Sequence, residues 1–298
     1  MAGQMRVLIT GNLGFVGVES TKYLRARGIK VIGYDIMDGK DIRDKEQFMD
    51  FCSENRPDRI LHLAAIARFA DADKNPKLAF ETNTLGTKNV AEVASELHTP
   101  LVYSSTASAI MPLDNFTPPF NEDIPARGNS VYGCTKAAGE FYVRECTPHI
   151  ILRYGHLLGA EKRFYGLIGG FISRIERGLA PTLYGGKQTN SFIYIKDIAR
   201  ANYLALTASW DKWDNTYNIG SLEEISTEDA GKMVCEIFDY RGEVEKGKIR
   251  TVDASRFWLD MKKAETMLSF KPEYSLRSGL IDMAKEMGYE IDNGKVKR

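Results

Sequence analysis

A tyrosine and a lysine four residues apart have types and spacing suited to acid–base chemistry. Tyr132 and Lys136 lie in the stretch SVYGCTKAAGEF at residues 130–141, which has helical character. Residues at i and i+4 lie on one face of a helix, so the lysine ammonium can favour ionisation of a phenol whose ordinary pKa is about 10. Such a phenol can act as a general acid and base. By itself the pair is more often a solvated surface contact, and its role depends on its surroundings.

A glycine-rich turn provides a second candidate site. The stretch TGNLGFVG places Gly11, Gly14 and Gly17 between a predicted strand and a predicted helix. The first glycine permits a tight turn, the second lets backbone approach a pyrophosphate, and the third lets the helix pack on the strand. Asp35 ends the next predicted strand, where a carboxylate binds ribose hydroxyls and repels a 2′-phosphate. A plain βα turn is the alternative, but this context predicts binding of NAD in preference to NADP.

A cluster of hydroxyl groups lies in the same region of the predicted fold. Ser104, Ser105 and Thr106 end a predicted strand, and a proline-containing loop at 111–129 connects them to the helix that carries Tyr132. In an open parallel sheet, ligands bind beyond the carboxyl ends of the strands. We therefore expect the glycine turn, the hydroxyl cluster and the tyrosine–lysine pair to form one site.

The elements that position these residues alternate between strands and helices. Strands are predicted at 6–10, 30–35, 59–64, 100–105 and 149–154, and helices at 15–28, 44–55, 76–97 and 130–146. This alternation predicts an α/β fold with a Rossmann-type doubly wound parallel sheet. We predict a dinucleotide-binding domain at 1–155, which some later segments rejoin. Residues 156–298 are expected to form mainly a smaller C-terminal substrate-binding lobe.

Composition narrows the classes of partner. Forty basic and forty acidic residues give a formal net charge of zero, so no bulk positive field favours nucleic acid or an anionic membrane. No segment approaches the roughly 18 apolar residues of a membrane span, and the N-terminus lacks the pattern of a signal peptide. The cysteines, Cys52, Cys134, Cys146 and Cys235, are too scattered for a zinc site. We expect free thiols, no metal and a cytoplasmic protein.

Ordered motifs extend along nearly the whole chain. They are TGNLGFVG at 10–17, YD at 34–35, DIRD at 41–44, LHLAA at 61–65, NTLGTKNV at 83–90, YSST at 103–106, YGCTK at 132–136, LRYGHLLG at 152–159, SFIYIKDIARA at 191–201 and RFWLDMKKAE at 256–265. Together they resemble the extended short-chain dehydrogenase/reductase family, and within it the NAD-dependent nucleotide-sugar epimerases and dehydratases.

The resemblance implies roles for three catalytic residues. Tyr132 would exchange a proton with a sugar hydroxyl while a hydride moves to or from the nicotinamide. Lys136 would stabilise the phenolate and hold the nicotinamide ribose. Thr106 falls at the family's catalytic Ser/Thr position and would hydrogen-bond the same sugar hydroxyl.

The resemblance also implies the contacts of the cofactor. Asp41 and Ile42 would flank the adenine, residues 63–67 would lie under the dinucleotide, and residues 154–156 would lie beside the nicotinamide. The predicted cofactor-binding residues are Gly11, Asn12, Leu13, Gly14, Phe15, Gly17, Asp35, Asp41, Ile42, Leu63, Ala64, Ala65, Ala67, Thr82, Ser104, Tyr132, Lys136, Tyr154 and His156.

The substrate side departs from the family's pattern. Ala107 and Ser108 stand where dehydratases usually carry an Asp-Glu pair, so elimination of water is not expected. Asn190 replaces an arginine that commonly binds the substrate's diphosphate. The predicted substrate-binding residues are Arg68, Thr106, His156, Asn190 and Arg250, with Lys187 and Arg256 as further candidate cations.

These features leave three functions open. The first is a UDP-sugar 4-epimerase with tightly bound NAD and a nucleotide-sugar substrate. The second is a dehydrogenase or reductase with net redox on a keto-sugar, a uronate or an amino acid. The third is a dinucleotide-sensing regulatory protein, which the presence of Thr106, Tyr132 and Lys136 disfavours. The resemblance also implies a homodimer that is formed by the helices near 83–97 and 130–146.

Overall fold

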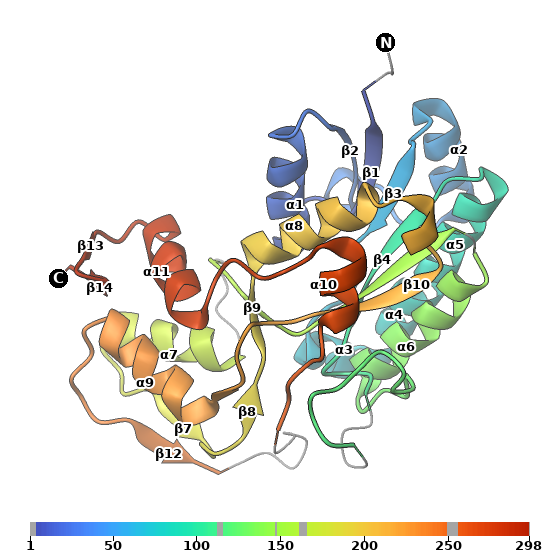
Figure 1. Ribbon diagram of the computed structural model, residues 1–298. Helices are drawn as coiled ribbons and strands as arrows, with labels where there is room; N and C mark the ends of the chain where they lie inside the picture. Colours follow the sequence, from blue (N-terminus) through green and yellow to red (C-terminus); the bar gives the residue numbers. More distant parts are fainter. Residues whose placement is uncertain (1–3, 112–115, 147, 161–165, 249–255, 298) are drawn as a thin grey trace.

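Six parallel strands form the central sheet (Figure 1), in the spatial order β10, β5, β4, β3, β1 and β2. Their bounds are β1 (Arg6–Thr10), β2 (Lys30–Tyr34), β3 (Arg59–His62), β4 (Leu101–Thr106), β5 (His149–Tyr154) and β10 (Asn215–Ile219). The structure is a computed structural model and describes residues 4–111, 116–146, 148–160, 166–248 and 256–297. Because the strands are parallel, their carboxyl ends lie along one edge of the sheet.

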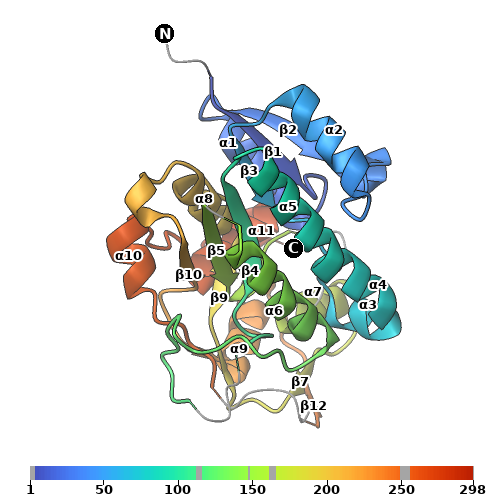
Figure 2. The same ribbon diagram turned by 90° about the vertical axis from the view of Figure 1, so that its right-hand side faces the viewer.

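Helices cover both faces of this sheet, because successive strand residues point to opposite faces. In β1, Val7 and Ile9 belong to one apolar core and Leu8 to a second. The helices of the first face are α1 (Phe15–Arg25) and α8 (Ile195–Leu206). Those of the second face are α2 (Lys45–Asn55), α5 (Thr87–Glu96) and α6 (Val131–Arg144), and Figure 2 shows α5 and α6 next to each other. The predicted doubly wound α/β fold is confirmed.

Segments from the second half of the chain complete the sheet and its helical cover. Strand β10 pairs with β5, with Asn215 opposite Ile150 and Ile219 opposite Tyr154. Helix α8 packs on α1, where Asn202 donates a hydrogen bond of 3.0 Å to the hydroxyl of Ser20. Residues after 156 therefore contribute to both layers, and the boundary of the substrate-binding lobe stays a proposal.

The remaining elements form a smaller group beside the carboxyl edge of the sheet (Figure 1). Its helices are α7 (Gly166–Glu176), α9 (Thr227–Ile237) and α11 (Leu276–Glu286), whereas α10 (Lys262–Leu268) packs on β10 of the central sheet. Its strands form two-stranded sheets: β6 (His156–Leu158) with β9 (Phe192–Tyr194), β7 (Thr182–Tyr184) with β12 (Glu245–Gly247), β8 (Thr189–Asn190) with β11 (Ile225–Ser226), and β13 (Ile291–Asp292) with β14 (Lys295–Val296). In the residues that the structure describes, no helix is long and apolar enough to span a membrane.

Two local differences from the sequence-based elements concern the region after β3. A short helix, α3 (Phe69–Lys74), occupies a segment for which no helix was predicted. The single helix predicted at 76–97 consists of α4 (Pro76–Phe80), a π-helical segment (Glu81–Gly86) and α5. The expected helix start is confirmed, because Asn75 caps α4 by accepting the Leu78 N–H at 3.1 Å and Pro76 follows the cap. π-Helical segments often accompany functional sites.

Candidate active site

The glycine turn has a backbone that larger residues cannot adopt. Gly11 has a φ of +71°, and a Cβ at this position would lie 2.8 Å from the backbone of Ala64. A Cβ on Gly17 would lie 2.1 Å from the carbonyl oxygen of Gly11. These two glycines therefore let β1, α1 and the loop after β3 approach closely.

The turn is also suited to an anion. Helix α1 begins after Gly14, with no side-chain cap among the described residues and no acidic residue in its first turn. Its first N–H groups and its dipole thus favour a negative group. Asp35 lies at the end of β2, where its carboxylate accepts the N–H groups of Leu13 at 2.9 Å and Met37 at 3.0 Å. The arrangement fits a dinucleotide, with the phosphates at α1 and a ribose near Asp35.

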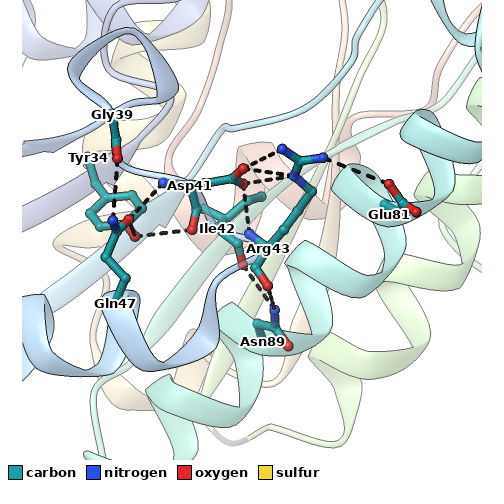
Figure 3. A network of polar contacts seen from close by, with 8 residues as sticks. All are labelled: Tyr34, Gly39, Asp41, Ile42, Arg43, Gln47, Glu81 and Asn89. Atoms are coloured by element: carbon teal, nitrogen blue, oxygen red, sulfur yellow. Dashed lines mark hydrogen bonds and ion pairs between the residues drawn. The ribbon is translucent and has the colours of Figure 1, made fainter.

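The loop at 41–43, in which Asp41 and Ile42 are predicted to flank the adenine, is fixed by a polar network (Figure 3). Asp41 accepts hydrogen bonds from the side chain of Arg43, whose guanidinium also lies 3.8 Å from Glu81. Asn89 of α5 donates to the carbonyl oxygens of Ile42 at 3.1 Å and Arg43 at 3.0 Å. The hydrogen bonds from Arg43 lower the pKa of Asp41. The network therefore holds the Asp41 carboxylate in place, in its ionised form, beside the edge of the sheet.

The catalytic candidates meet at the carboxyl end of β4. Ser130 caps α6 by accepting the Gly133 N–H at 3.0 Å, which places Tyr132 in the first turn of the helix. The side chain of Thr106 lies beside the phenol of Tyr132. Phe69 of α3 packs edge-on against the same ring, with centroids 5.4 Å apart. Burial raises the pKa of Tyr132 to about 12, and the interaction with Thr106 opposes that rise.

Lys136 follows one turn later on α6 and is only 2% exposed. Its Nζ lies 4.1 Å from the centroid of the Tyr103 ring, a cation–π distance. Burial lowers the pKa of Lys136 to about 7, and the negative charge of Glu140 opposes that change. Burial therefore shifts Tyr132 and Lys136 towards their neutral forms, so their charges depend on the groups placed around them.

A buried chain of hydrogen bonds, which sequence reasoning missed, lies beneath these residues. The His62 ring is hydrogen-bonded to the Thr10 hydroxyl at 2.7 Å and to the Thr87 hydroxyl at 2.9 Å. Thr10 also accepts the N–H groups of Leu63 at 3.2 Å and Ala64 at 3.3 Å. This chain therefore connects β1, β3 and α5 directly behind the glycine turn.

Asn83, in the π-helical segment, is a second residue that the sequence did not single out. It accepts the Ile66 N–H at 2.7 Å and donates to the Ile66 carbonyl oxygen and the Thr135 hydroxyl, each at 3.0 Å. It therefore joins the loop at 63–68 to α6. The only sign of Asn83 in the sequence is that its amide side chain follows Thr82, the predicted cofactor contact. Thr82 is half-buried.

Near the end of β5, the side chain of Tyr154 points into the core. Its hydroxyl donates to Asn202 of α8 at 2.5 Å. The side chain is 3% exposed, so the predicted contact with the nicotinamide would have to use the backbone. His156 follows at the start of β6, where its ring lies edge-on to Phe257 with centroids 5.0 Å apart.

The predicted substrate residues have partners within the chain. Arg68, at the start of α3, lies 3.5 Å from Asp71, and Asn190 donates to the hydroxyl of Thr227 at 3.1 Å. Arg256 forms a two-point ion pair with Glu224, with hydrogen bonds of 2.8 and 2.6 Å. Lys187 is exposed. Arg250 lies outside the described residues, and its role stays a prediction.

The structure thus places the glycine turn, the loop after β3, Thr106 and the start of α6 along one edge of the sheet. The other predicted cofactor residues lie in the same loops: Asn12 and Phe15 are half-buried in the glycine turn, and Ala65 and Ala67 follow β3. Fold and site define a dinucleotide-binding enzyme of the Rossmann class.

Comparisons with known proteins identify the family. The model of the NAD dependent epimerase/dehydratase family matches residues 7–220, and the chain belongs to this family of NAD-dependent enzymes. A protein of Methanocaldococcus jannaschii with the name "Putative UDP-glucose 4-epimerase" is 30% identical, over 92% of this chain and 95% of its own. The predictions of an NAD-dependent enzyme and of its family are confirmed.

Solved structures of relatives agree in fold. The UDP-glucose 4-epimerase of Thermotoga maritima, solved with UDP-glucose, has a TM-score of 0.88 and 27% identity, and the match covers 95% of this chain and 99% of that one. The UDP-glucose 4-epimerase of Thermus thermophilus, solved with NAD, has a TM-score of 0.82 and 27% identity, with coverage of 96% and 100%.

Proposed function

We propose that this enzyme is a nucleotide-sugar epimerase that inverts C4 of a UDP-sugar with NAD as its cofactor. The observation that carries the proposal is the position of Tyr132 in the first turn of α6, beside Thr106 at the end of β4 and one helical turn before the buried Lys136. Removing a proton from a sugar hydroxyl requires a general base, and a phenol at the carboxyl edge of the sheet can act as one. The similarity to two UDP-glucose 4-epimerases supports this choice of substrate.

Each residue has a defined task in this mechanism. Tyr132 removes the proton from the C4 hydroxyl and later returns it, while Thr106 hydrogen-bonds the same oxygen and orients it. The protonated, positively charged form of Lys136 stabilises the phenolate of Tyr132. The glycine turn and Asp35 would hold the pyrophosphate and a ribose of NAD, which supplies the reversible acceptor for the C4 hydrogen. Both hydrogens removed from the C4–OH unit are returned, so net redox is zero.

Elimination of water is not proposed for this enzyme. A dehydratase needs a further acid and base next to the reacting sugar, whereas Thr106 is followed by Ala107 and Ser108. Ala107 is fully buried and carries no ionisable group. The residues after Thr106 therefore favour epimerisation over dehydration.

The proposal is tested with purified protein and no added NAD. UDP-glucose, UDP-galactose and their N-acetyl relatives are supplied separately, and products are separated by ion-exchange chromatography. Interconversion of at least one C4 pair is expected. The absence of interconversion for every pair, in protein shown to contain NAD, would contradict the proposal.

Net oxidation or reduction is the second candidate, and the Arg256–Glu224 ion pair favours it. That pair neutralises one of the candidate cations for a diphosphate, and the Asn190 side chain already donates to Thr227. A substrate without a diphosphate would need neither residue. Absorbance of NADH with added NAD and a panel of keto-sugars, uronates and amino acids separates the candidates, because an epimerase causes no net change.

We further propose a homodimer that is formed by the helices near 83–97 and 130–146, which are the end of the π-helical segment with α5, and α6. Leu85 and Phe141 lie on these elements with exposures of 38 and 61%, and Phe80, just before them in α4, is 48% exposed. Exposed large apolar side chains are candidates for an interface between subunits. Light scattering should give the mass of a dimer for the parent protein and a lower mass for Phe141→Gln. Trp210→Gln, which changes an equally exposed residue in a short 3-10 helix at 210–212, should leave the mass unchanged. A monomeric parent protein would contradict the proposal.

A cytoplasmic location is also proposed, on the basis of thiol chemistry. Cys52, Cys134, Cys146 and Cys235 are free cysteines, as is usual in a reducing compartment.

A further inference from the structure

Arg43 contacts both oxygens of the Asp41 carboxylate. Its backbone N–H donates to Oδ1 at 2.9 Å, its Nε lies 3.0 Å from Oδ1 and 2.8 Å from Oδ2, and its Nη2 donates to Oδ2. In the part of the chain that the structure describes, every hydrogen bond to this carboxylate comes from Arg43. A planar guanidinium that reaches both oxygens fixes the plane of a carboxylate, which a lysine ammonium does not.

The backbone of this loop is held by residues other than the Arg43 side chain (Figure 3). The side-chain oxygen of Gln47 accepts the N–H of Asp41 at 2.9 Å. Asn89 binds the next two residues, through the carbonyl oxygens of Ile42 and Arg43. Loss of the Arg43 side chain would therefore free the carboxylate and leave the path of the backbone in place.

The π-helical segment contacts the loop at both of its ends. Nη1 of Arg43 lies 3.8 Å from Oε2 of Glu81, the first residue of the segment. A Cβ on Gly86, its last residue, would lie 2.7 Å from Cδ1 of Ile42, so this side chain lies directly on the segment. The guanidinium is thus held between two carboxylates, of which only Asp41 is predicted to flank the adenine.

A fixed carboxylate at this place can discriminate between bases. The 6-amino group of adenine donates a hydrogen bond, whereas hypoxanthine carries at that place a carbonyl oxygen, which accepts one. An ionised carboxylate only accepts, and its two oxygens have about four acceptor positions, so Asp41 can bind Arg43 and one further donor. The hydrogen bonds from Arg43 lower the pKa of Asp41, which keeps it in this form.

We propose that Arg43 is a positioning residue for the adenine of NAD, which holds the Asp41 carboxylate in the orientation that accepts the 6-amino group and so makes the site selective for adenine. The inference rests on the predicted contact of Asp41 and Ile42 with the base. It adds a residue that acts through Asp41 and was not among the predicted cofactor residues. It does not depend on which sugar reaction the enzyme catalyses.

A plain surface ion pair and a general charge effect are the alternatives. The Arg43 and Asp41 side chains are 39 and 24% exposed, and exposed pairs contribute little to the free energy of unfolding. Lys45 is a matched control because it is 38% exposed, lies in the next turn of chain and pairs with Glu92 at 3.0 Å and Glu96 at 2.9 Å. Lys45→Met removes the same charge without touching the Asp41 carboxylate.

The test is a competition between NAD and nicotinamide hypoxanthine dinucleotide, which has oxygen in place of the 6-amino group. Each protein is equilibrated with equal excess concentrations of both. The bound dinucleotides are then released by denaturation and quantified by chromatography. Samples first loaded with NAD and samples first loaded with the analogue must reach the same ratio, which shows equilibrium. Circular dichroism and thermal unfolding confirm that each variant is folded.

The parent protein should favour NAD by about 10- to 100-fold, the value of one hydrogen bond to a charged group. Arg43→Met should lower this selectivity about tenfold with little change in the unfolding midpoint, whereas Lys45→Met should retain it. Arg43→Lys, which keeps the charge without the two-point contact, should lie between them and serves as the test if Arg43→Met does not fold. Asp41→Ala should abolish selectivity, and adding Arg43→Met to it should have no further effect.

Three results would overturn the proposal. They are equal binding of both dinucleotides by the parent protein, unchanged or increased selectivity in the Arg43 variants, and an equal loss of selectivity in Lys45→Met. Since no sugar is present, a failure of the epimerase proposal is detected separately, by the absence of sugar conversion, and leaves the role of Arg43 unaffected.

Discussion

His62 and Tyr103 stack beneath Lys136, with ring centroids 5.5 Å apart and an interplanar angle of 28°. Because Thr10 already accepts two backbone N–H groups, its own hydroxyl hydrogen is directed at Nδ1 of His62. The imidazole is then neutral with its proton on Nε2, which donates to Thr87. Burial, followed by the charge of Lys136, lowers the pKa of His62 well below its ordinary value.

This neutral histidine should make stability depend on pH. Since the pKa of His62 is lower in the folded protein than in the unfolded chain, the unfolded chain takes up a proton below about pH 6.5 and the folded protein does not. The contribution of His62 is complete above that pH. It decreases by up to about 1.4 kcal/mol for each pH unit below it.

Urea unfolding of the parent protein and of His62→Gln between pH 5 and 7 measures this effect. The variant should be less stable at pH 7 but show a shallower loss towards pH 5. His149, whose pKa is also lowered by burial, contributes equally to both proteins and cancels in the comparison. Parallel curves would contradict the expected linkage.

Substitution of the proposed acid–base residue should separate chemistry from binding. Tyr132→Phe removes only the hydroxyl, and we expect turnover to decrease by about 10² to 10⁴-fold, the range typical of general acid–base catalysis. NAD content after purification should stay the same. Cys134→Ser, an exposed position on the same helical turn, is the matched control and should retain parent activity. Turnover of Tyr132→Phe within a few-fold of the parent protein would exclude the assigned role.

Two glycines in helices should respond in opposite ways to a single added methyl group. In Gly17→Ala the Cβ would lie 2.1 Å from the Gly11 carbonyl oxygen, so the turn must open and NAD affinity and stability should both fall. Gly170 in α7 has open space around its Cβ position, and Gly170→Ala should stabilise the helix by about 0.5–1 kcal/mol. Thermal unfolding and calorimetric NAD titration measure both effects. Equal responses would show that the close approach is unimportant.

The two arginines that bind Glu140 should differ in their effect on stability. Arg153 is 2% exposed at its side chain and Arg144 is 41% exposed. Arg153→Met leaves the Glu140 carboxylate without its buried partner and should cost about 3–5 kcal/mol, whereas Arg144→Met should cost about 1 kcal/mol or less. Denaturant unfolding at pH 7 measures the difference. A similar cost for both would mean that solvent reaches the Glu140–Arg153 pair.

The strands and helices of the first half were predictable because local signals agree with the fold there. Continuous β-branched runs become buried parallel strands, and Pro76, Ser130 and the glycine turn mark where helices begin. The π-helical segment was not predictable, because helical periodicity in a sequence does not distinguish an α-helical turn from a single π-helical one. Its effect, the placement of Asn83 between Ile66 and Thr135, depends on three segments that are distant in sequence.

The candidate site was predictable in its cofactor half and less so beneath it. Gly11, Gly14, Gly17 and Asp35 form a local pattern with a direct physical meaning. In contrast, the importance of Glu140 and His62 arises from burial and from partners on other strands. A glutamate at a helical position is most often exposed, and nothing in its neighbours shows that Arg153 will reach it from β5.

Strand β10 covers the outer edge of β5, although some sixty residues separate the two in the chain. During synthesis, β5 leaves the ribosome long before its neighbour, and its free backbone N–H and C=O groups on that side remain open to other chains. Helix α8, which packs on α1, is made shortly before β10, which pairs with β5. The nascent chain therefore completes both contacts in close succession. Translation beyond Ile219 is thus the step that ends this exposure to aggregation and to chaperones.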